Sequence, residues 1–380
     1  MAEIYDFVVV GAGIAGASAA FELASHGRTV LIEREQFPGY HSTGRSAAIF
    51  LETYGNATVR ALTRGSRAFF EAPPVGFSDV PLVTPRGALF VADSESLSEL
   101  RAHYAAVSQL ATTARWVEAE ELGALFPCAI QDHWVAAVYE PDALDLDVHA
   151  LHQGFLRKFK ERGGVLRTET EILQGSRKGS LWTLQTSQGE VQAPYIVNAA
   201  GAWGDVLAGL VNVKPLNISA KRRTAVIVDA SENPEHWPYI GDIAETFYIK
   251  PETGRLLASP CDETEVMPCD VQPEEFDVAS IAYRLQQVTT LPVERIHRRW
   301  AGLRTFAPDR TPVAGFAADT EGFFWLVGQG GYGIQTSPSM ATICGGLITG
   351  NGIPHRLLDL GITQEALSPA RFESKETVLA

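Results

Sequence analysis

The sequence is poor in cysteine. Its 380 residues contain only Cys128, Cys261, Cys269 and Cys344. Their spacing matches no metal-ligand motif, so we expect no metal site. So few cysteines are typical of a protein from a reducing compartment, which favours a cytoplasmic location.

Positive charge and long apolar runs are also scarce. The chain has 31 Lys and Arg residues against 45 Asp and Glu residues, which gives a formal net charge of −14. This acidic balance disfavours nucleic acid or an anionic membrane as a partner. The sequence contains no run of 18 apolar residues and no basic leader, so we expect no integral membrane segment.

A glycine-rich turn follows the first apolar run. Residues 7–10 predict a buried strand, and Gly11, Gly13 and Gly16 follow it in G-x-G-x-x-G spacing. In this pattern the first glycine permits a tight turn and the second lets a pyrophosphate approach the backbone. The third lets the next helix pack closely on the strand. The turn therefore predicts a dinucleotide-binding site.

The segment after the glycines supports this interpretation. Helix-forming residues run from Ala17 to Ser25, and the apolar residues 29–32 predict a second strand that ends at Glu33. An acid in this place accepts hydrogen bonds from an adenosine ribose, and the amides at the helix N-terminus receive the pyrophosphate. The pattern does not distinguish NAD from FAD.

Two later segments also combine an apolar strand with small residues. Residues 195–198 predict a strand that runs into Ala200 and Gly201, whose small size would let the strand end contact a cofactor. Residues 323–327 predict another strand, and the glycine-rich turn at 328–333 opens a helix. The N-terminus of that helix would stabilise a second negative centre.

The length and the pattern predict two domains. A chain of 380 residues exceeds what one core usually holds. Residues 216–299 alternate apolar and polar in several runs, as in an antiparallel sheet with one covered face. We assign residues 1–80, 141–215 and 300–366 to an α/β, Rossmann-like dinucleotide domain, residues 81–140 and 216–299 to an α+β substrate domain, and residues 367–380 to a tail.

Nearly the whole chain, to about Arg371, resembles the D-amino-acid-oxidase-like flavoprotein family, and within it the bacterial D-arginine dehydrogenases. The matching segments include GAGIAGAS at 11–18, PGYHSTGRSAA at 38–48, VNAAGAW at 197–203, WAGLR at 300–304 and QGGYGIQTS at 329–337. The resemblance implies FAD rather than NAD, in a domain built from three segments beside a substrate domain with an antiparallel sheet. No cysteine for covalent attachment of the flavin is evident, since Cys344 falls within a predicted helix, so we expect non-covalent FAD.

The resemblance also implies cofactor contacts by position. To these we add the glycines of the first turn, the small residues after the strand at 195–198, and Gly302. The predicted cofactor residues are Gly11, Gly13, Ala15, Gly16, Glu33, Arg34, Ser42, Thr43, Gly44, Arg45, Ser46, Ala47, Ala48, Ile49, Ile172, Ala200, Gly201, Gly302, Gly330, Gly331, Tyr332, Gly333, Ile334 and Gln335.

The resemblance implies a substrate site as well. Arg223 and Arg304 match arginines around the substrate carboxylate, and a guanidinium fork suits a carboxylate because it binds both oxygens. Tyr248 matches their hydroxyl partner, and Tyr54 matches a tyrosine on a mobile covering loop. Gly331 matches a backbone carbonyl that receives the substrate amine.

Two positions depart from the family pattern. The dehydrogenases have a histidine after SAA and a glutamate after PRP, and both recognise the arginine side chain; here these positions hold Ile49 and Ala88. We therefore expect that recognition of a cationic side chain is lost, unless Glu52 replaces it.

These residues together predict an FAD-dependent dehydrogenase or oxidase. It would deaminate an α-amino acid, a D-amino acid with an apolar side chain, by hydride transfer from Cα to flavin N5. The imino acid would then hydrolyse to a 2-oxo acid and ammonia. A glycine- or sarcosine-type or cyclic secondary amine oxidase is an alternative, as is a non-catalytic flavin-binding protein. The electron acceptor stays open between a quinone, another carrier and oxygen.

Overall fold

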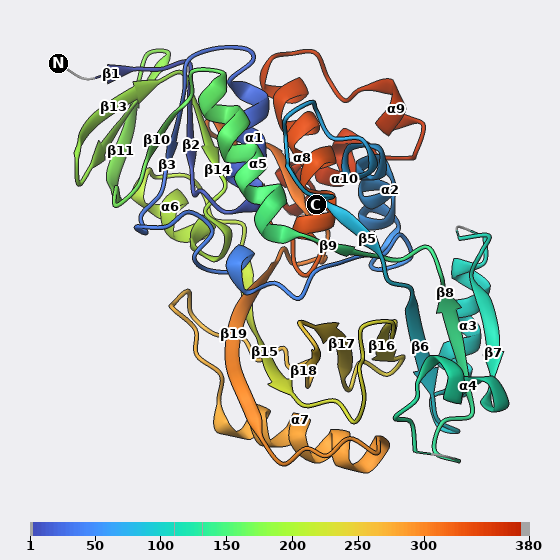
Figure 1. Ribbon diagram of the computed structural model, residues 1–380. Coiled ribbons are helices and arrows are strands. Elements are labelled where there is room, and N and C mark those ends of the chain that lie inside the picture. Colours follow the sequence, from blue (N-terminus) through green and yellow to red (C-terminus); the bar gives the residue numbers. More distant parts are fainter. Residues whose placement is uncertain (1–2, 110, 131, 374–380) are drawn as a thin grey trace, which may run out of the picture.

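Two large β-sheets organise the chain (Figure 1). The computed structural model describes residues 3–109, 111–130 and 132–373. In these ranges no helix combines the length and the apolar character needed to cross a lipid bilayer.

The first sheet has the parallel core expected for dinucleotide binding. Its strands lie in the order β10-β3-β2-β14-β21-β20, and only the edge strand β20 is antiparallel. The bounds are β2 Phe7–Val10, β3 Thr29–Ile32, β10 Val165–Arg167, β14 Tyr195–Asn198, β20 Val313–Phe316 and β21 Phe323–Val327. The four inner strands are buried along almost their whole length because both faces of the sheet are covered.

Helices cover one face of this sheet, and a smaller sheet covers the other. The helices are α1 Ile14–Leu23, α2 Ala57–Glu71, α5 Val148–Glu161 and α8 Gly333–Ile348. The small sheet has the order β1-β13-β12-β11, and α6 packs beside it. Its elements are β1 Glu3–Ile4, β11 Ile172–Lys178, β12 Leu181–Thr186, β13 Gly189–Ala193, the 3₁₀ turn η2 Gly201–Trp203 and α6 Gly204–Leu210.

The second large sheet joins two distant parts of the sequence. Its order is β19-β15-β18-β17-β16-β6-β8-β7, and all neighbours are antiparallel except β16 and β6, which are parallel. The strands are β6 Ala88–Ala92, β7 Arg115–Glu118, β8 Ala136–Glu140, β15 Ser219–Val228, β16 Tyr239–Asp242, β17 Tyr248–Glu252, β18 Arg255–Ser259 and β19 Ile296–Phe306. Helices α3 Leu97–Val107, α4 Ala119–Leu125 and α7 Glu275–Val288 pack against it. The division into two domains stays a prediction, and its proposed boundary at residue 300 falls inside β19.

A three-stranded sheet lies where the chain passes between the two large sheets. It contains β4 Ile49–Phe50, β5 Val83–Pro85 and β9 Leu144–Leu146. Because residues 144–146 pair as a strand, helix α5 starts at Val148 and not at Asp145, and the Asp147 side chain caps it by accepting from Ala150 N at 2.8 Å.

The C-terminal residues continue the packing of the first domain. Further short elements are η1 Thr43–Arg45, α9 His355–Leu358, α10 Gln364–Leu367 and η3 Pro369–Phe372. The predicted tail therefore starts too early, because Leu367 is fully buried and Arg371 donates to Asp309 and Thr311. Residues 374–380 of that tail lie outside the described residues.

Candidate functional site

One long cavity runs between the two large sheets. It receives most of the predicted site residues from segments far apart in the sequence. Those lining it are Gly11, Gly13, Ala15, Glu33, Arg34, Ser42, Thr43, Arg45, Ser46, Ala47, Ala48, Ile49, Tyr54, Ile172, Ala200, Gly201, Arg223, Tyr248, Gly302, Arg304, Gly330, Gly331, Gly333, Ile334 and Gln335.

Three predicted contact residues, Gly16, Gly44 and Tyr332, are not among the lining residues within the described chain. A Cβ on Gly16 would lie 1.7 Å from the Gly11 carbonyl oxygen, so Gly16 permits α1 to approach β2. Gly44 packs in the same way against Gly39. Tyr332 is buried against Tyr54, with ring centroids 5.0 Å apart, and burial raises its pKa to about 12. These three residues therefore do not line the cavity but pack against residues that do.

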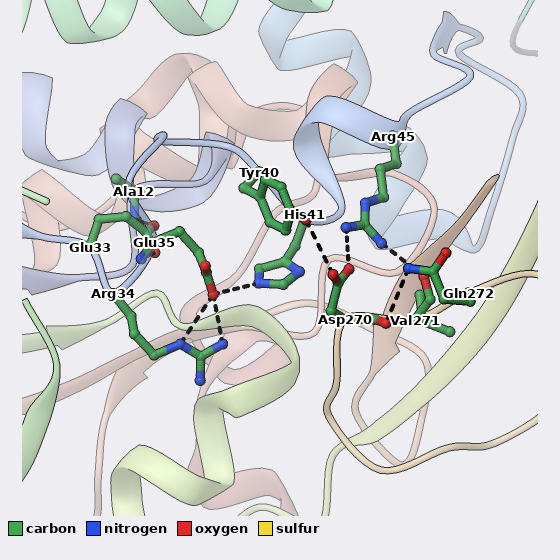
Figure 2. A network of polar contacts seen from close by, with 10 residues as sticks. All are labelled: Ala12, Glu33, Arg34, Glu35, Tyr40, His41, Arg45, Asp270, Val271 and Gln272. Atoms are coloured by element: carbon green, nitrogen blue, oxygen red, sulfur yellow. Dashed lines mark hydrogen bonds and ion pairs between the residues drawn. The ribbon is translucent and has the colours of Figure 1, made fainter. Parts of the chain in front are cut away.

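Glu33 directly follows β3 and lines the cavity beside the glycine-rich turn after β2. We call this part of the cavity its dinucleotide end. Its carboxylate accepts from Ala12 N at 2.7 Å and from Glu35 N at 3.0 Å. Next to it, the Arg34 guanidinium lies 4.6 Å from the Trp203 ring centroid and is paired with Glu35. Figure 2 shows Glu33, Arg34 and Glu35 beside His41, whose Nε2 is 3.0 Å from Glu35.

The loop after Glu33 joins the two domains. Thr43 Oγ1 accepts from Ile14 N at 2.9 Å, which holds the loop to the start of α1. Farther along, Arg45 donates to the carbonyls of Val271 and Ala301 and is paired with Asp270 (Figure 2). These links fix the loop between the β2–α1 turn and the second sheet. No local pattern points to Asp270, which lies 225 residues from Arg45.

The geometry at this end fits a bound dinucleotide. Gly13, the N-cap of α1, has no side chain to cap the helix, so apart from the Ile14 amide, which donates to Thr43, the first-turn amides are left for a pyrophosphate. A Cβ on Gly201, which lines the cavity, would meet no atom within 4 Å. Val206 and Leu210 on α6, which the sequence does not single out, are exposed and line the cavity, so they offer apolar surface to a bound cofactor.

Arg304 dominates the other end of the cavity. It comes from β19, and its Nη1 is 3.5 Å from the Tyr54 hydroxyl. A Cβ on Gly331 would lie 3.0 Å from its guanidinium carbon, so the glycine turn before α8 packs directly on this cation. Among the described residues, no carboxylate lies within ion-pair distance of Arg304. Burial acts to lower its pKa, but the tyrosine hydroxyls around it outweigh burial and raise the pKa, so the guanidinium stays charged.

Arg223 also lines the cavity, but it already has protein partners. Its Nε donates to the Asp262 carbonyl at 2.9 Å, and its Nη2 is 3.3 Å from Glu263. Strand alternation turns the neighbouring Arg222 to the opposite side, where it is buried against Asp277.

Two stacked tyrosines line the same part of the cavity as Arg223 and Arg304. Tyr248 and Tyr239 have ring centroids 5.5 Å apart, and burial raises the pKa of both. Cys261 also lines this wall, and burial raises its pKa to about 11. Tyr239 and Cys261 are not recognisable in the sequence, because the strand pairing that brings them to Tyr248 is not visible in local patterns.

Ile49 and Ala88 stand where the dehydrogenases have the histidine and glutamate that recognise the arginine side chain, and they differ in their exposure to the cavity. Ile49 lines the cavity, whereas Ala88 is fully buried behind it against Leu51 and Ala143. Glu52 turns away and forms an ion pair with Arg67. The hypothesis that Glu52 replaces the missing acid therefore has no geometric support in the described structure.

Comparisons with known proteins identify relatives of this chain. The family described as FAD dependent oxidoreductase (DAO) matches residues 6–345. Mitochondrial dimethylglycine dehydrogenase of Rattus norvegicus is 23% identical over 353 residues, which are 87% of this chain and 41% of that protein. Glycine oxidase of Bacillus licheniformis is 22% identical over 93% of this chain and 95% of its own length. This chain thus spans well under half of the dimethylglycine dehydrogenases that it matches.

Solved structures share the fold. Glycine oxidase from Geobacillus kaustophilus superposes with a TM-score of 0.81 at 22% identity, over 91% of this chain and 95% of that one. L-proline dehydrogenase from P. horikoshii has the same TM-score and identity over 98% and 99%. With the family match extending over most of its length, the chain belongs to the FAD dependent oxidoreductase family, and its cofactor is FAD.

Proposed function

We propose that the protein oxidises an α-amino acid, a D-amino acid with an apolar side chain, to an imino acid that hydrolyses to a 2-oxo acid and ammonia. The observation that carries this proposal is Arg304, a half-buried cation in the cavity without a carboxylate partner in the described chain. A charge in that environment favours an anionic ligand. The carboxylate of an amino acid supplies one.

The surrounding groups suit the orientation of such a substrate. Tyr54 would donate to a carboxylate held by Arg304, and Tyr248 and Arg223 would bound it on the opposite side. The Gly331 carbonyl would accept from the substrate amine. FAD, when bound, supplies the acceptor for the hydride that leaves the substrate Cα.

The side-chain preference rests on the wall beside Tyr54. Ile49, Leu51 and Phe90 line the cavity there, and Glu52 is paired outside it. Two acids, Asp242 and Glu245, also line the cavity, but Asp242 already accepts from Ala244 N and from the Thr246 hydroxyl. Against the apolar wall itself a cationic side chain would lose hydration, whereas an apolar one would bury its surface. The D configuration rests on the resemblance to the bacterial D-arginine dehydrogenases.

A glycine- or sarcosine-type substrate, or a cyclic secondary amine, is the second candidate. Its support is the likeness to proteins named dimethylglycine dehydrogenase, glycine oxidase and L-proline dehydrogenase. Such substrates present the same carboxylate to Arg304 but need little or no side-chain space.

Anaerobic reduction of the flavin tests both candidates without requiring the natural acceptor. The purified protein is mixed with D- and L-amino acids, glycine, sarcosine and proline, and the loss of flavin absorbance is followed. We expect D-leucine, D-methionine or D-phenylalanine to reduce it fastest. Fastest reduction by D-arginine or D-lysine would contradict the apolar preference, and no reduction by any compound would contradict the proposed reaction.

We also propose that FAD is held without a covalent bond. Cys344 is fully buried in the core on α8 and is not among the cavity-lining residues, whereas Cys261 lines the cavity. Acid precipitation should release the flavin into the supernatant. Flavin that stays in the wild-type pellet but is released from a Cys261→Ser variant would identify a covalent link instead.

A further inference from the structure

A buried carboxylate holds the loop that carries Tyr54. Glu140, the last residue of β8, is only 4% exposed. The Thr53 hydroxyl lies 2.6 Å from its Oε1 and 2.7 Å from its Oε2. Thr53 is itself 1% exposed and directly precedes Tyr54. The contact joins the N-terminal segment of the chain to the second large sheet.

The surroundings of Glu140 give its carboxylate few other partners. Among the described residues, the one basic group within ion-pair distance is His103 on α3, with Nε2 at 3.7 Å. That distance is too long for a hydrogen bond, and His103 Nε2 is a buried atom without a partner in the same set. A buried carboxylate needs hydrogen-bond donors, so the Thr53 hydroxyl is strongly held.

The neighbours of Thr53 are fixed as well, but by weaker or more exposed contacts. Leu51 N donates to Gln335 Oε1 at 3.0 Å, and Glu52 pairs with Arg67, whose side chain is 30% exposed. Between this anchored stretch and the left-handed Gly55, with φ of 87°, the Tyr54 ring projects toward Arg304. The position of the Tyr54 hydroxyl therefore depends on where Thr53 is held.

We propose that Glu140 is a positioning residue that acts through Thr53 to place the Tyr54 hydroxyl beside the substrate carboxylate. Glu140 is not among the residues lining the cavity in the described chain, so it acts on the substrate site only through the loop. The role of Tyr54 rests on the proposed function. The anchoring of residues 51–55 does not, which allows the two to be tested separately.

The test uses the FAD-bound enzyme and the isosteric variant Thr53→Val, which removes the hydroxyl. Anaerobic single-turnover reduction by the best substrate gives a dissociation constant and a limiting reduction rate. We expect the dissociation constant to rise about tenfold, the effect of losing one hydrogen bond to a charged group, with a much smaller change in the limiting rate. Thr53→Ser keeps the hydroxyl and should restore wild-type binding. Hydrogen exchange of the 51–55 amides should be faster in Thr53→Val than in Thr53→Ser.

Two further variants separate this role from a general loosening of the loop. Glu140→Gln keeps an acceptor for Thr53 but loses the charge, so we expect an intermediate dissociation constant. Arg67→Gln frees Glu52 on the same loop and should leave the dissociation constant within about twofold of wild type, as for a partly exposed ion pair. Equal binding by Thr53→Val and Thr53→Ser, or unchanged hydrogen exchange in Thr53→Val, would overturn the proposal. Faster exchange together with no reduction of the wild-type enzyme by any amino acid would instead overturn the proposed function and leave the anchoring intact.

Discussion

The two ends of the cavity are built in opposite ways. The dinucleotide end consists mainly of backbone, with glycines where a side chain would collide and amides at the start of α1. The substrate end consists of side chains from distant segments, including Tyr54, Arg223, Tyr248 and Arg304. A backbone site is set by the fold and tolerates little change. A side-chain site can change its preference while the fold and the cofactor remain.

The largest effect is expected at the dinucleotide end, where adding one methyl group to Gly16 should abolish most FAD binding. In Gly16→Ala the new Cβ would lie 1.7 Å from the Gly11 carbonyl oxygen, so α1 must move away from β2. We expect the ratio of bound FAD to protein to fall below about a tenth of the wild-type value, because the helix N-terminus leaves the pyrophosphate position. The absorbance of the flavin band relative to the ultraviolet absorbance of the aromatic side chains measures this ratio.

Gly123→Ala is the matched control, because a Cβ at this glycine of α4 meets no atom within 4 Å. It should keep full FAD content. Full FAD content in Gly16→Ala would show that close packing of α1 on β2 is not required.

The same comparison at the substrate end uses Arg304→Met. FAD should stay bound, but the substrate carboxylate would lose its main cation in a partly dehydrated site. A lost charged partner costs about 2–5 kcal/mol, so we expect KM to rise about a hundredfold or more. Arg298→Met, at an exposed position farther along the same strand and outside the cavity lining, should leave KM unchanged. A near wild-type kcat/KM for Arg304→Met would reject its assignment as the carboxylate anchor.

The difference between the two ends also explains what the sequence can predict. The β2–α1 turn and Glu33 are recognisable because their chemistry lies within one short segment. The parallel strands β2, β3, β14 and β21 follow from the same kind of local pattern. At the substrate end, the sequence identifies Arg223 but not its partners Asp262 and Glu263, which reach it through the pairing of β15 with neighbouring segments.

Two expectations about side-chain recognition show the same limit. Ala88 is on the predicted strand, yet it lies behind the cavity lining, since the packing of Leu51 and Ala143 decides its exposure. Glu52 is near Tyr54 in sequence, but the partner that turns it outward, Arg67, is on α2. Local patterns do not contain these three-dimensional pairings.

A smaller effect is expected from a variant that changes the preference for the substrate side chain and leaves Arg304, the proposed carboxylate anchor, in place. Ile49→Glu places a carboxylate in the apolar wall, where it can pair with a cationic side chain. We expect the ratio of kcat/KM for D-arginine to that for D-leucine to rise about tenfold. Glu52→Gln, which changes the outward-facing acid, should leave that ratio unchanged. A change in the ratio with Glu52→Gln but not with Ile49→Glu would contradict the assignment of Ile49 to the side-chain wall.

The smallest predicted effect is a pH dependence of stability at the dinucleotide end. His152 on α5 is 4% exposed, and its Nε2 lies 2.9 Å from the Ala12 carbonyl oxygen in the glycine turn. Burial lowers the pKa of His152 below its ordinary value. Below that ordinary value, about 6.5, the unfolded chain therefore binds more protons than the folded protein, and the folded state loses stability as the pH falls.

His152→Gln isolates this contribution, because the glutamine amide can still donate to Ala12 but does not titrate. Between about pH 7.5 and pH 5.5, which brackets the ordinary histidine pKa, the Tm of the wild type should fall about 2 °C more than that of the variant. Thermal unfolding of both FAD-bound proteins across this range measures the difference, and all other titrating groups are common to the two. Parallel declines would mean that His152 takes up its proton equally in the folded and unfolded states. The glycine turn would then be held by its packing, which the Gly16→Ala variant probes, and by the bonds from Ala12 N to Glu33 and from Ile14 N to Thr43, without a pH-dependent contribution from His152.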